Sequence, residues 1–207
     1  MALILLDYDG VLVDSVAAES KYFTAACEKV GIEGIHTGED LARLCEGNFY
    51  EECDKIGIDR DLIDQAFALY EKKLDDENYP IEAFPEAMEF IKETVARFPV
   101  YIITSNFSAT VAEMMERWHI EGIRDILGAE KEASKVRKFN SVKALFPGEK
   151  TYFICDTKGD ILEARESDID VIIGVTWGCH MPEVLASAEP DYLFYKFEEL
   201  RTFFHEL

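Results

Sequence analysis

Two patterns of apolar residues alternate along this chain. Short continuous apolar runs are typical of buried strands in a parallel sheet. Longer stretches with apolar residues three or four positions apart are typical of helices that pack on one face. The expected strands are 3–6, 100–103, 126–129, 151–155, 171–175 and 192–194. The expected helices after residue 80 are 86–97, 108–119, 135–146, 160–167, 182–188 and 197–204. This alternation predicts a three-layer α/β fold with a Rossmann-like parallel sheet.

The segment between the first two strands breaks this alternation. From Ser15 to Asn78 no strand-like pattern occurs, and we expect helices at 16–30, 40–45, 49–57 and 60–75. Gly31 is expected to end the first of these helices, and Asp14 or Ser15 to cap its start. Pro85 suits the first turn of the next core helix. The sequence therefore predicts an all-helical insertion directly after the first strand.

Polar side chains follow three of the expected strands at the point where each strand ends. Asp7 and Asp9 follow the first, Thr104 to Asn106 follow the second, and Asp156 with Asp160 follow the strand at 151–155. In an open parallel sheet these ends meet at one crevice, so we expect the side chains to lie together. Paired carboxylates repel one another unless a proton or a cation lies between them. Oxygen ligands without His or Cys favour Mg²⁺.

Composition limits the classes of function. The chain has 207 residues, 48% of them apolar, which suffices for one core and a small accessory unit. Its net charge of −21 argues against binding to nucleic acid or to anionic membrane surfaces. The five cysteines are odd in number and show no CxxC spacing, which favours free thiols in a reducing compartment. No apolar run suits a signal segment or a membrane span. We therefore expect a soluble, cytoplasmic protein.

Short motifs along the chain resemble those of one enzyme family. LILLDYDGVLVDS resembles the DxDGxLxDS motif of the haloacid dehalogenase-like (HAD) hydrolases at every defined position. ITSN is similar to the family's second motif, with Thr104 as the matching residue. CDTKGDILEA resembles the fourth motif, DxxxD, through Asp156 and Asp160, although Cys155 stands where the family more often has Gly. IGVTWG and PDYL resemble the phosphoglycolate phosphatase-like branch.

The family's third motif is a lysine ahead of the helix that precedes the last catalytic strand. Lys131, Lys135 and Lys138 all compete for this place. We choose Lys135, because Ser134 can cap a helix that begins there and the ammonium would then point toward the strand ends. Lys131 is the alternative.

The resemblance implies a division into two domains. Residues 1–14 and 81–207 would form a HAD-like catalytic core, and residues 15–80 would form a small helical cap over it. The turn Glu46-Gly47-Asn48 would be a specificity loop. The candidate cap cations for a second anionic group on the substrate are Lys21, Arg43 and Lys55. Trp177 and His180 could line the site, although a core tryptophan and a surface histidine are the simpler interpretation.

The resemblance also implies roles for the polar residues. Asp7 would attack phosphorus and form an aspartyl-phosphate, and Asp9 would act as general acid and then general base. Mg²⁺ would be held by Asp7, the backbone carbonyl of Asp9 and Asp156, and Asp160 would hold a metal-bound water or orient the lysine. The residues implied to contact the phosphoryl group or the substrate are Thr104, Ser105, Asn106 and Lys135.

The activity implied is that of a Mg²⁺-dependent phosphatase acting on a small phosphomonoester, such as a phosphoglycolate-like compound, a sugar phosphate or a nucleotide. Asp9 favours phosphatases and phosphomutases within the family, because a halide leaving group needs no proton. A phosphomutase of the β-phosphoglucomutase type shares the same residues and is one alternative. A non-catalytic binding module on the same fold is another. We expect a monomer or homodimer whose partner is a small phosphorylated metabolite.

Overall fold

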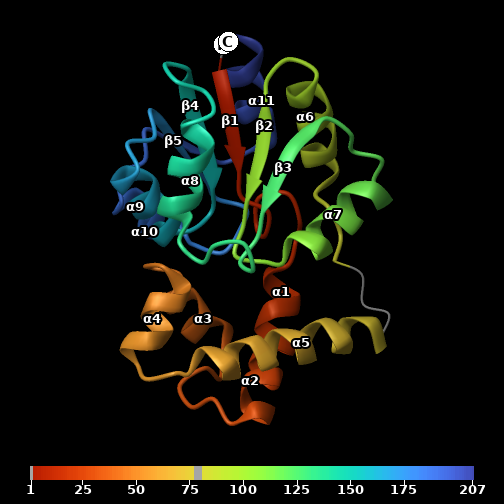
Figure 1. Cartoon of the computed structure of the whole chain (residues 1–207), viewed down its shortest axis with the longest axis vertical. Helices are drawn as coiled ribbons and strands as arrows, with labels where there is room; N and C mark the ends of the chain where they lie inside the picture. The colour runs from red at the N-terminus through yellow and green to blue at the C-terminus, as the bar shows by residue number, and fades with distance from the viewer. Residues whose placement is uncertain (1, 77–80) are drawn as a thin grey trace.

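The computed structural model describes residues 2–76 and 81–207. Six parallel strands form one sheet in the order β3-β2-β1-β4-β5-β6 (Figure 1). The first strand, β1, lies at the centre and pairs with β2 and β4, so the residues after it occupy the middle of the carboxyl edge. The predicted parallel α/β sheet is confirmed. The strands are β1 (Ala2–Leu6), β2 (Val100–Ile103), β3 (Ile123–Leu127), β4 (Lys150–Cys155), β5 (Val171–Val175) and β6 (Tyr192–Phe194).

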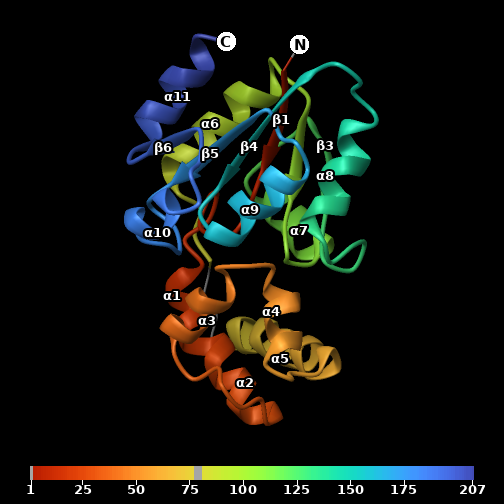
Figure 2. The ribbon, with the colours of Figure 1, turned by 90° about the vertical axis from the view of Figure 1, so that its left-hand side faces the viewer.

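Side chains of β1 alternate between the two faces of the sheet, as its pleat requires. Ile4 and Leu6 pack into the core that α6, α7 and α11 cover. Leu3 and Leu5 pack into the opposite core, against α8, α9 and α10 (Figure 2). Both faces of β1 are therefore sealed from water, and its position at the centre of the sheet is fixed. The core helices are α6 (Pro85–Val95), α7 (Ser108–Arg117), α8 (Lys135–Lys143), α9 (Lys158–Glu166), α10 (Pro182–Ala186) and α11 (Phe197–His205).

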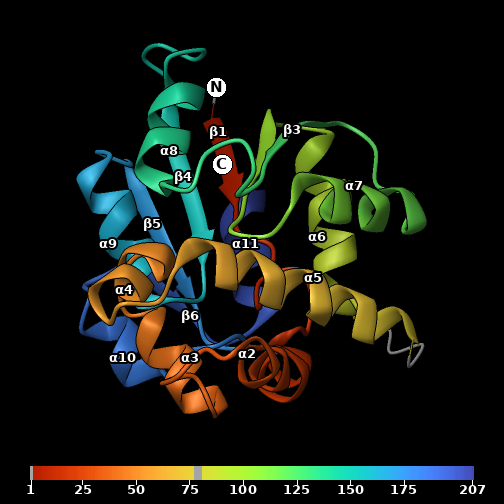
Figure 3. The same ribbon diagram turned by 60° about the horizontal axis from the view of Figure 1, so that its bottom comes forward.

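The helical insertion lies across the carboxyl ends of the strands (Figures 1 and 3). It has a hydrophobic core of its own, in which Phe23, Cys27, Ile35 and Ile63 are almost fully buried. The prediction of an all-helical insertion after the first strand is confirmed, and we call it the cap. Its elements are α1 (Val16–Ala18), the π-helical turn η1 (Glu19–Phe23), α2 (Thr24–Val30), α3 (Gly38–Leu44), α4 (Phe49–Lys55) and α5 (Arg60–Asp76).

The chain enters and leaves the cap through two adjacent segments, 12–14 and 82–84, which we call the stem. Val13 and Ala83 form an antiparallel bridge, and the amide of Asp14 donates to the carbonyl of Glu82 at 2.9 Å. The predicted boundary at residue 80 falls within 77–80, outside the described residues. The domain limits therefore stay a prediction.

Some strand and helix ends differ from the expectations. The expected strand at 126–129 is β3, which begins at Ile123 and ends at Leu127. β3 is an edge strand, so the exposed Arg124 and Asp125 can lie inside it, and their charges hid its start. The helix expected at 135–146 ends at Lys143, and Leu145, expected to face inward, is 66% exposed.

Helix starts also differ, because side-chain caps decide them. Ser15 occupies the cap position of α1 but makes no capping hydrogen bond. α3 begins at Gly38 rather than at 40, because Thr37 and Asp40 form a capping box. α9 begins before Asp160, because the side chain of Thr157 accepts a bond from the Asp160 amide at 3.3 Å.

No helix among the described residues is both long and apolar enough to cross a lipid bilayer. The five cysteines are all free thiols, as expected.

Candidate active site

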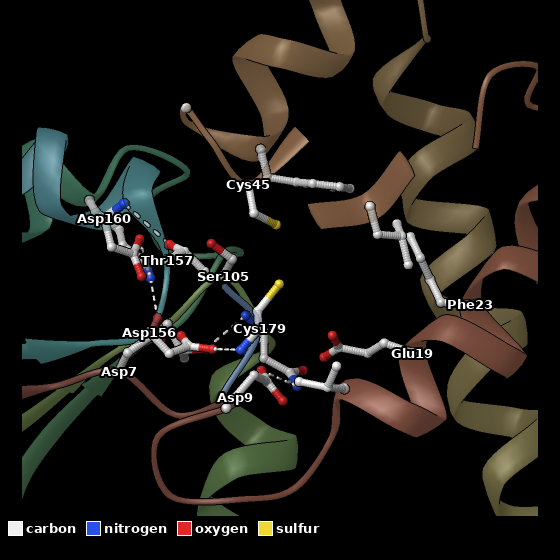
Figure 4. A pocket seen from close by; sticks show the side chains of 18 of the residues that line it. Asp7, Asp9, Glu19, Phe23, Cys45, Ser105, Asp156, Thr157, Asp160 and Cys179 are labelled. Atoms are coloured by element: carbon white, nitrogen blue, oxygen red, sulfur yellow. Dashed lines mark hydrogen bonds and ion pairs between the residues drawn. The ribbon is translucent and has the colours of Figure 1, made fainter. Parts of the chain in front are cut away.

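The carboxyl ends of β1, β2 and β4 bring three predicted site residues together beneath the cap, and Figure 4 labels two of them, Asp7 and Asp156. Asp7 follows β1, Thr104 follows β2 and Asp156 follows β4, and all three are buried. Gly10 permits the sharp turn after Asp7, because its φ is +68° and a Cβ there would overlap the carboxylate of Asp156. The topology of the sheet, rather than nearness in sequence, therefore assembles the site.

Lys135 lies at the centre of the acidic cluster. Its Nζ donates to Asp7 Oδ2 at 2.7 Å and lies 2.7 Å from Asp160 Oδ1, and its side chain is only 4% exposed. The predicted N-cap of this helix is confirmed: α8 begins at Lys135, and the side chain of Ser134 accepts a hydrogen bond from the Arg137 amide. The helix start therefore aims the ammonium at the ends of the strands.

The two competing lysines occupy different places. Lys131 is 44% exposed and donates to Asp125 at 2.9 Å, beside the edge strand β3 and away from the acidic cluster. Lys138 is buried, and its Nζ donates to the carbonyl of Thr104 at 2.6 Å. Burial and the nearby charge of Lys135 lower the pKa of Lys138 to about 8. Lys138 thus ties α8 to the end of β2 behind the site.

Charge is unevenly shared among these buried groups. Burial raises the pKa of Asp7 well above its usual range, and the charges of Asp160 and Asp156 add to this, although Lys135 opposes it. Burial also disfavours the charged forms of Lys135 and Asp160, but their mutual attraction outweighs it. The pKa of Lys135 is therefore raised and that of Asp160 lowered. The site is short of positive charge, since one ammonium faces three carboxyl groups.

Three carboxylates could hold a hard divalent cation. Asp7, Asp156 and Asp160 each offer an oxygen, and these atoms lie within 4.8 Å of one another. Asp156 Oδ1 and Asp160 Oδ2 are buried without a hydrogen-bond partner. A buried, unpartnered carboxylate oxygen is costly, and a metal ion would remove that cost. Asp9, also expected at the metal, is not among the side chains of this cluster; its expected contact is through the backbone carbonyl.

We expect the metal-free protein to lose stability as pH rises through this cluster's titration. Burial raises the pKa of Asp156 from 3.8 to about 7. The folded chain thus holds this proton more tightly than the unfolded chain, so the stabilisation is full below pH 4 and is lost as pH rises to about 7. In chelator, Asp156→Asn should gain several degrees of Tm over wild type between about pH 5 and pH 8. A constant Tm difference across this range would contradict the expectation.

Asp9 lies beside the second strand end. Its Oδ2 accepts a bond from Asn106 Nδ2 at 3.3 Å, and the Asn106 amide donates to Thr104 Oγ1 at 3.0 Å. Burial raises the pKa of Asp9, although the bond from Asn106 works in the opposite direction. A carboxyl group whose pKa is raised is protonated more readily, as a general acid must be.

The turn Glu46-Gly47-Asn48 joins the cap to the core. Asn48 Nδ2 donates to Glu163 Oε1 at 2.9 Å, and Lys158 Nζ donates to Glu46 Oε2 at 2.9 Å. Gly47 lines the pocket. Its carbonyl oxygen lies so close to Gly159 that a Cβ on residue 159 would overlap this oxygen. The turn therefore rests on the start of α9, where Gly159 allows the close approach.

We expect Gly159→Ala to hold the cap away from the core. The added Cβ would displace the turn, so kcat/KM should fall about 10- to 100-fold, because small misplacements of catalytic groups cost this much. Tm should change little, since Ala is favoured over Gly in a helix. Glu166→Ala, at the exposed far end of the same helix, is the control. Full activity of Gly159→Ala in a steady-state assay would show that this contact is dispensable.

The other residues proposed for the cap lie elsewhere. Lys21, Arg43 and Lys55 are not among the described residues that line the pocket. Arg43 and Lys55 have side chains 71% and 63% exposed, paired with acids of their own helices. Lys21 donates to Tyr22 Oη at 2.8 Å. The structure therefore places no predicted cap cation in the pocket.

Trp177 and His180 follow β5 in different environments. The Trp177 ring stacks on Phe197 with centroids 4.0 Å apart, as a core tryptophan would. The prediction of a surface histidine is wrong: His180 is 5% exposed. Its Nδ1 accepts a bond from the Lys158 amide at 2.9 Å, and its Nε2 lies 2.7 Å from the carbonyl of Ala42 in the cap. His180 therefore links the core to the cap.

Sequence reasoning missed the residues by which the cap faces the site. Glu19 points its carboxyl into the pocket toward Asp9 (Figure 4). Its signal was weak: it is a lone acid one turn after Ser15, in a helix start that is otherwise apolar. The apolar and aromatic cap residues that line the pocket could not be told from core residues in the sequence, because they share a helix face with buried side chains. They are Val16, Phe23, Leu41, Phe49, Phe67 and Tyr70.

A family model described as haloacid dehalogenase-like hydrolase matches residues 4–174. A search of curated proteins found no match. Residues 4–174 include both acidic motifs, Lys135 and the whole cap.

Solved structures share the fold over nearly the whole chain. A haloacid dehalogenase-like family hydrolase from Streptococcus pneumoniae is 25% identical, with a TM-score of 0.74, and the match covers 98% of this chain and 97% of that one. A predicted phosphatase from Clostridium acetobutylicum is 18% identical, with a TM-score of 0.79 and coverage of 100% and 99%. A predicted phosphoglycolate phosphatase from Haemophilus somnus 129pt is 19% identical, with a TM-score of 0.71 and coverage of 97% and 96%.

Proposed function

Because the chain belongs to the haloacid dehalogenase-like hydrolase family, we propose that it is a Mg²⁺-dependent phosphatase of small phosphomonoesters. The observation that carries this proposal is the placement of Lys135 between Asp7 and Asp160, beside the ends of β2 and β4. A nucleophile, a cation and hydroxyl or amide donors around one point are what phosphoryl transfer requires.

In this proposal Asp7 attacks the phosphorus atom and forms an aspartyl-phosphate while the ester oxygen departs. Asp9 gives its proton to that oxygen, and then takes a proton from the water that hydrolyses the acyl phosphate. The same carboxyl can serve both steps because the first step leaves it as a base. Thr104 and Lys135 offset charge on the phosphoryl oxygens, and Ser105 and Asn106 line the same side of the pocket.

The donor set supports a magnesium site formed by Asp7, Asp156 and Asp160, together with the backbone carbonyl of Asp9. Its all-oxygen character suits Mg²⁺, and the two unpartnered oxygens would gain a partner. When bound, the ion would supply positive charge that allows an anionic nucleophile to approach an anionic phosphate. Asp160 would also orient Lys135, whose Nζ lies 2.7 Å from Asp160 Oδ1.

The alternatives are weighed by the same geometry. A phosphomutase would use the same residues and would differ in needing a sugar bisphosphate to keep the enzyme phosphorylated. A non-catalytic module would have no need to bury three carboxyl groups around one lysine, since this arrangement is costly. This burial favours an enzyme over a binding module, and the requirement for a sugar bisphosphate separates the two enzymatic functions.

Phosphate release from a panel of phosphomonoesters, with Mg²⁺ and with chelator, tests the proposal. We expect turnover that requires Mg²⁺. Turnover only in the presence of a sugar bisphosphate, without net phosphate release, would identify a mutase. No reaction of a folded sample with any ester would contradict both enzymatic functions. The cytoplasmic location and the monomeric or homodimeric state stay predictions.

A further inference from the structure

The half of the pocket formed by the cap is mostly apolar, and its polar side-chain groups are the carboxyl of Glu19, the hydroxyl of Tyr70 and the thiol of Cys45. The pocket has a volume of about 130 Å³ and lies between the acidic cluster and the cap. An apolar cavity of ~150 Å³ is large enough for benzene. Because the same space must also take the phosphoryl group, the group that lies against the cap must be small, no larger than one ring or a short chain. The apolar and aromatic residues on this side are Val16, Phe23, Leu41, Phe49, Phe67 and Tyr70.

Three phenylalanines from three cap helices hold one another in place in this wall. The ring centroids of Phe23 and Phe67 lie 4.5 Å apart, and that of Phe49 lies 6.2 Å from Phe67. Phe67 also reaches Phe107 of the core, at 6.4 Å. Because the rings pack against each other, the wall is a fixed surface that an apolar group can contact without ordering loose side chains.

Of the described residues lining the pocket, those on the cap side offer no cation that would bind a second anionic group. Among the described residues that line the pocket, Lys135 is the one cation, and Asp7 and Asp160 both contact it at the phosphoryl end. Carboxylates and phosphates are bound in proteins by Arg, Lys or clustered backbone amides. A substrate carboxylate placed against Phe49 or Phe67 would lose its hydration without a partner, which is costly.

Glu19 strengthens this exclusion. Its carboxyl enters the pocket from the first turn of the cap and faces Asp9 (Figure 4). When ionised it would repel an anionic group, and when protonated it could donate one hydrogen bond to a neutral oxygen. Burial, together with the charge of Asp9, raises the pKa of Glu19 to about 8. In neither state does it provide positive charge.

We propose that this enzyme selects phosphomonoesters whose leaving group is a small, apolar alcohol without a second anionic group, and that it discriminates against phosphoglycolate and sugar bisphosphates. This inference rests on the proposed phosphatase function and assigns its substrate class. The phosphoryl group would lie at Asp7 and Lys135, and the alcohol would lie against Phe23, Phe49 and Phe67.

Steady-state kinetics with two alkyl esters test the selectivity. The esters are 2-phenylethyl phosphate and 2-phosphoglycolate, both derived from primary alcohols, so that a difference in rate reports recognition more than intrinsic reactivity. In Mg²⁺, kcat/KM for 2-phenylethyl phosphate should exceed that for 2-phosphoglycolate by about 10-fold or more, as expected for burial of an apolar group. Equal values, or a preference for 2-phosphoglycolate, would overturn the inference and leave the phosphatase function standing.

A binding measurement makes the inference independent of turnover. The non-hydrolysable analogues are 3-phenylpropylphosphonate and 3-phosphonopropionate, whose dissociation constants calorimetry can measure in Mg²⁺. Tighter binding of the phenyl analogue supports the apolar pocket. If it occurs while no ester is hydrolysed, the proposed phosphatase function is contradicted and the proposed binding preference is kept. Tighter binding of 3-phosphonopropionate would overturn the substrate class.

Two variants locate the selectivity in the cap. Leu41→Arg places a guanidinium in the wall at a half-buried position, and it should raise kcat/KM for 2-phosphoglycolate relative to 2-phenylethyl phosphate by about 10-fold. Glu19→Gln tests the same exclusion with a smaller change in structure and should shift the ratio in the same direction. Arg43→Ala, which changes an exposed cation outside the pocket, should leave the ratio unchanged. Loss of 2-phosphoglycolate turnover in Arg43→Ala would contradict the inference.

Discussion

Asp7→Asn should lower phosphatase activity by about 10⁴-fold or more while leaving the metal-free protein at least as stable as wild type. The activity falls because an amide cannot attack phosphorus. Stability is kept because burial already disfavours the ionised form of Asp7, whose pKa is raised. Asn keeps an oxygen for the Tyr8 amide, which donates to Asp7 Oδ1 at 2.8 Å. Lys135 keeps its contact with Asp160.

Phosphate release and thermal unfolding in chelator check the two halves of this expectation. An activity within tenfold of wild type would place the nucleophile elsewhere. A large fall in Tm would mean that Asp7 is kept mainly for its ion pair with Lys135. Acid quenching of the wild-type reaction, followed by mass spectrometry, should find phosphate on the peptide that contains Asp7.

Lys135→Met should destabilise the metal-free protein by about 3–5 kcal/mol and abolish measurable turnover. Methionine has a similar length but no charge, so Asp7 and Asp160 would face each other in a buried site without their shared cation. Removing one partner of a buried ion pair costs this much because the remaining charge is uncompensated. Mg²⁺ should recover part of the stability, since it supplies positive charge to the same carboxylates.

Lys131→Met is the matched control, because it removes the same charge a few residues earlier. Lys131 is 44% exposed and pairs with Asp125 at the surface, where ion pairs contribute little. We expect its activity and Tm to stay close to wild type. The opposite ranking of the two variants, in urea unfolding and in phosphate release, would show that Lys131 is the functional lysine.

The parts of the fold that were predictable have strong local signals. The central strand was readable because the run LILL ends in acids and a glycine. The position of Lys135 at a helix start is predictable because Ser134, its neighbour in the sequence, can cap that helix, and the structure confirms this N-cap. The start of β3 was not readable, because Arg124 and Asp125 break its apolar run and only its place at the sheet edge makes them tolerable.

The contacts between cap and core carry no comparable signal in the sequence. Tyr50 Oη donates to the carbonyl of Ser105 at 3.2 Å, across 55 positions of the chain. The sequence around His180 predicts a surface residue, because nothing in its neighbours reveals the cap carbonyl beside it. Glu19 was missed because a lone acid at the start of a helix gives no sign that it faces Asp9 across the pocket. Such features depend on how the cap docks on the core.

The stem makes the cap an exchangeable unit. Because Val13 and Ala83 pair where the chain leaves and re-enters the core, both ends of the insertion lie side by side on one short ribbon. A cap grafted from a relative would have to match this ribbon and to rest on the start of α9 as the turn Glu46-Gly47-Asn48 does. Loops tolerate insertion where their ends are close. Asp7 and Asp9 would keep their places at the end of β1 while the graft brings its own wall. Recombination at the stem is thus a direct route to new specificities on an unchanged catalytic core.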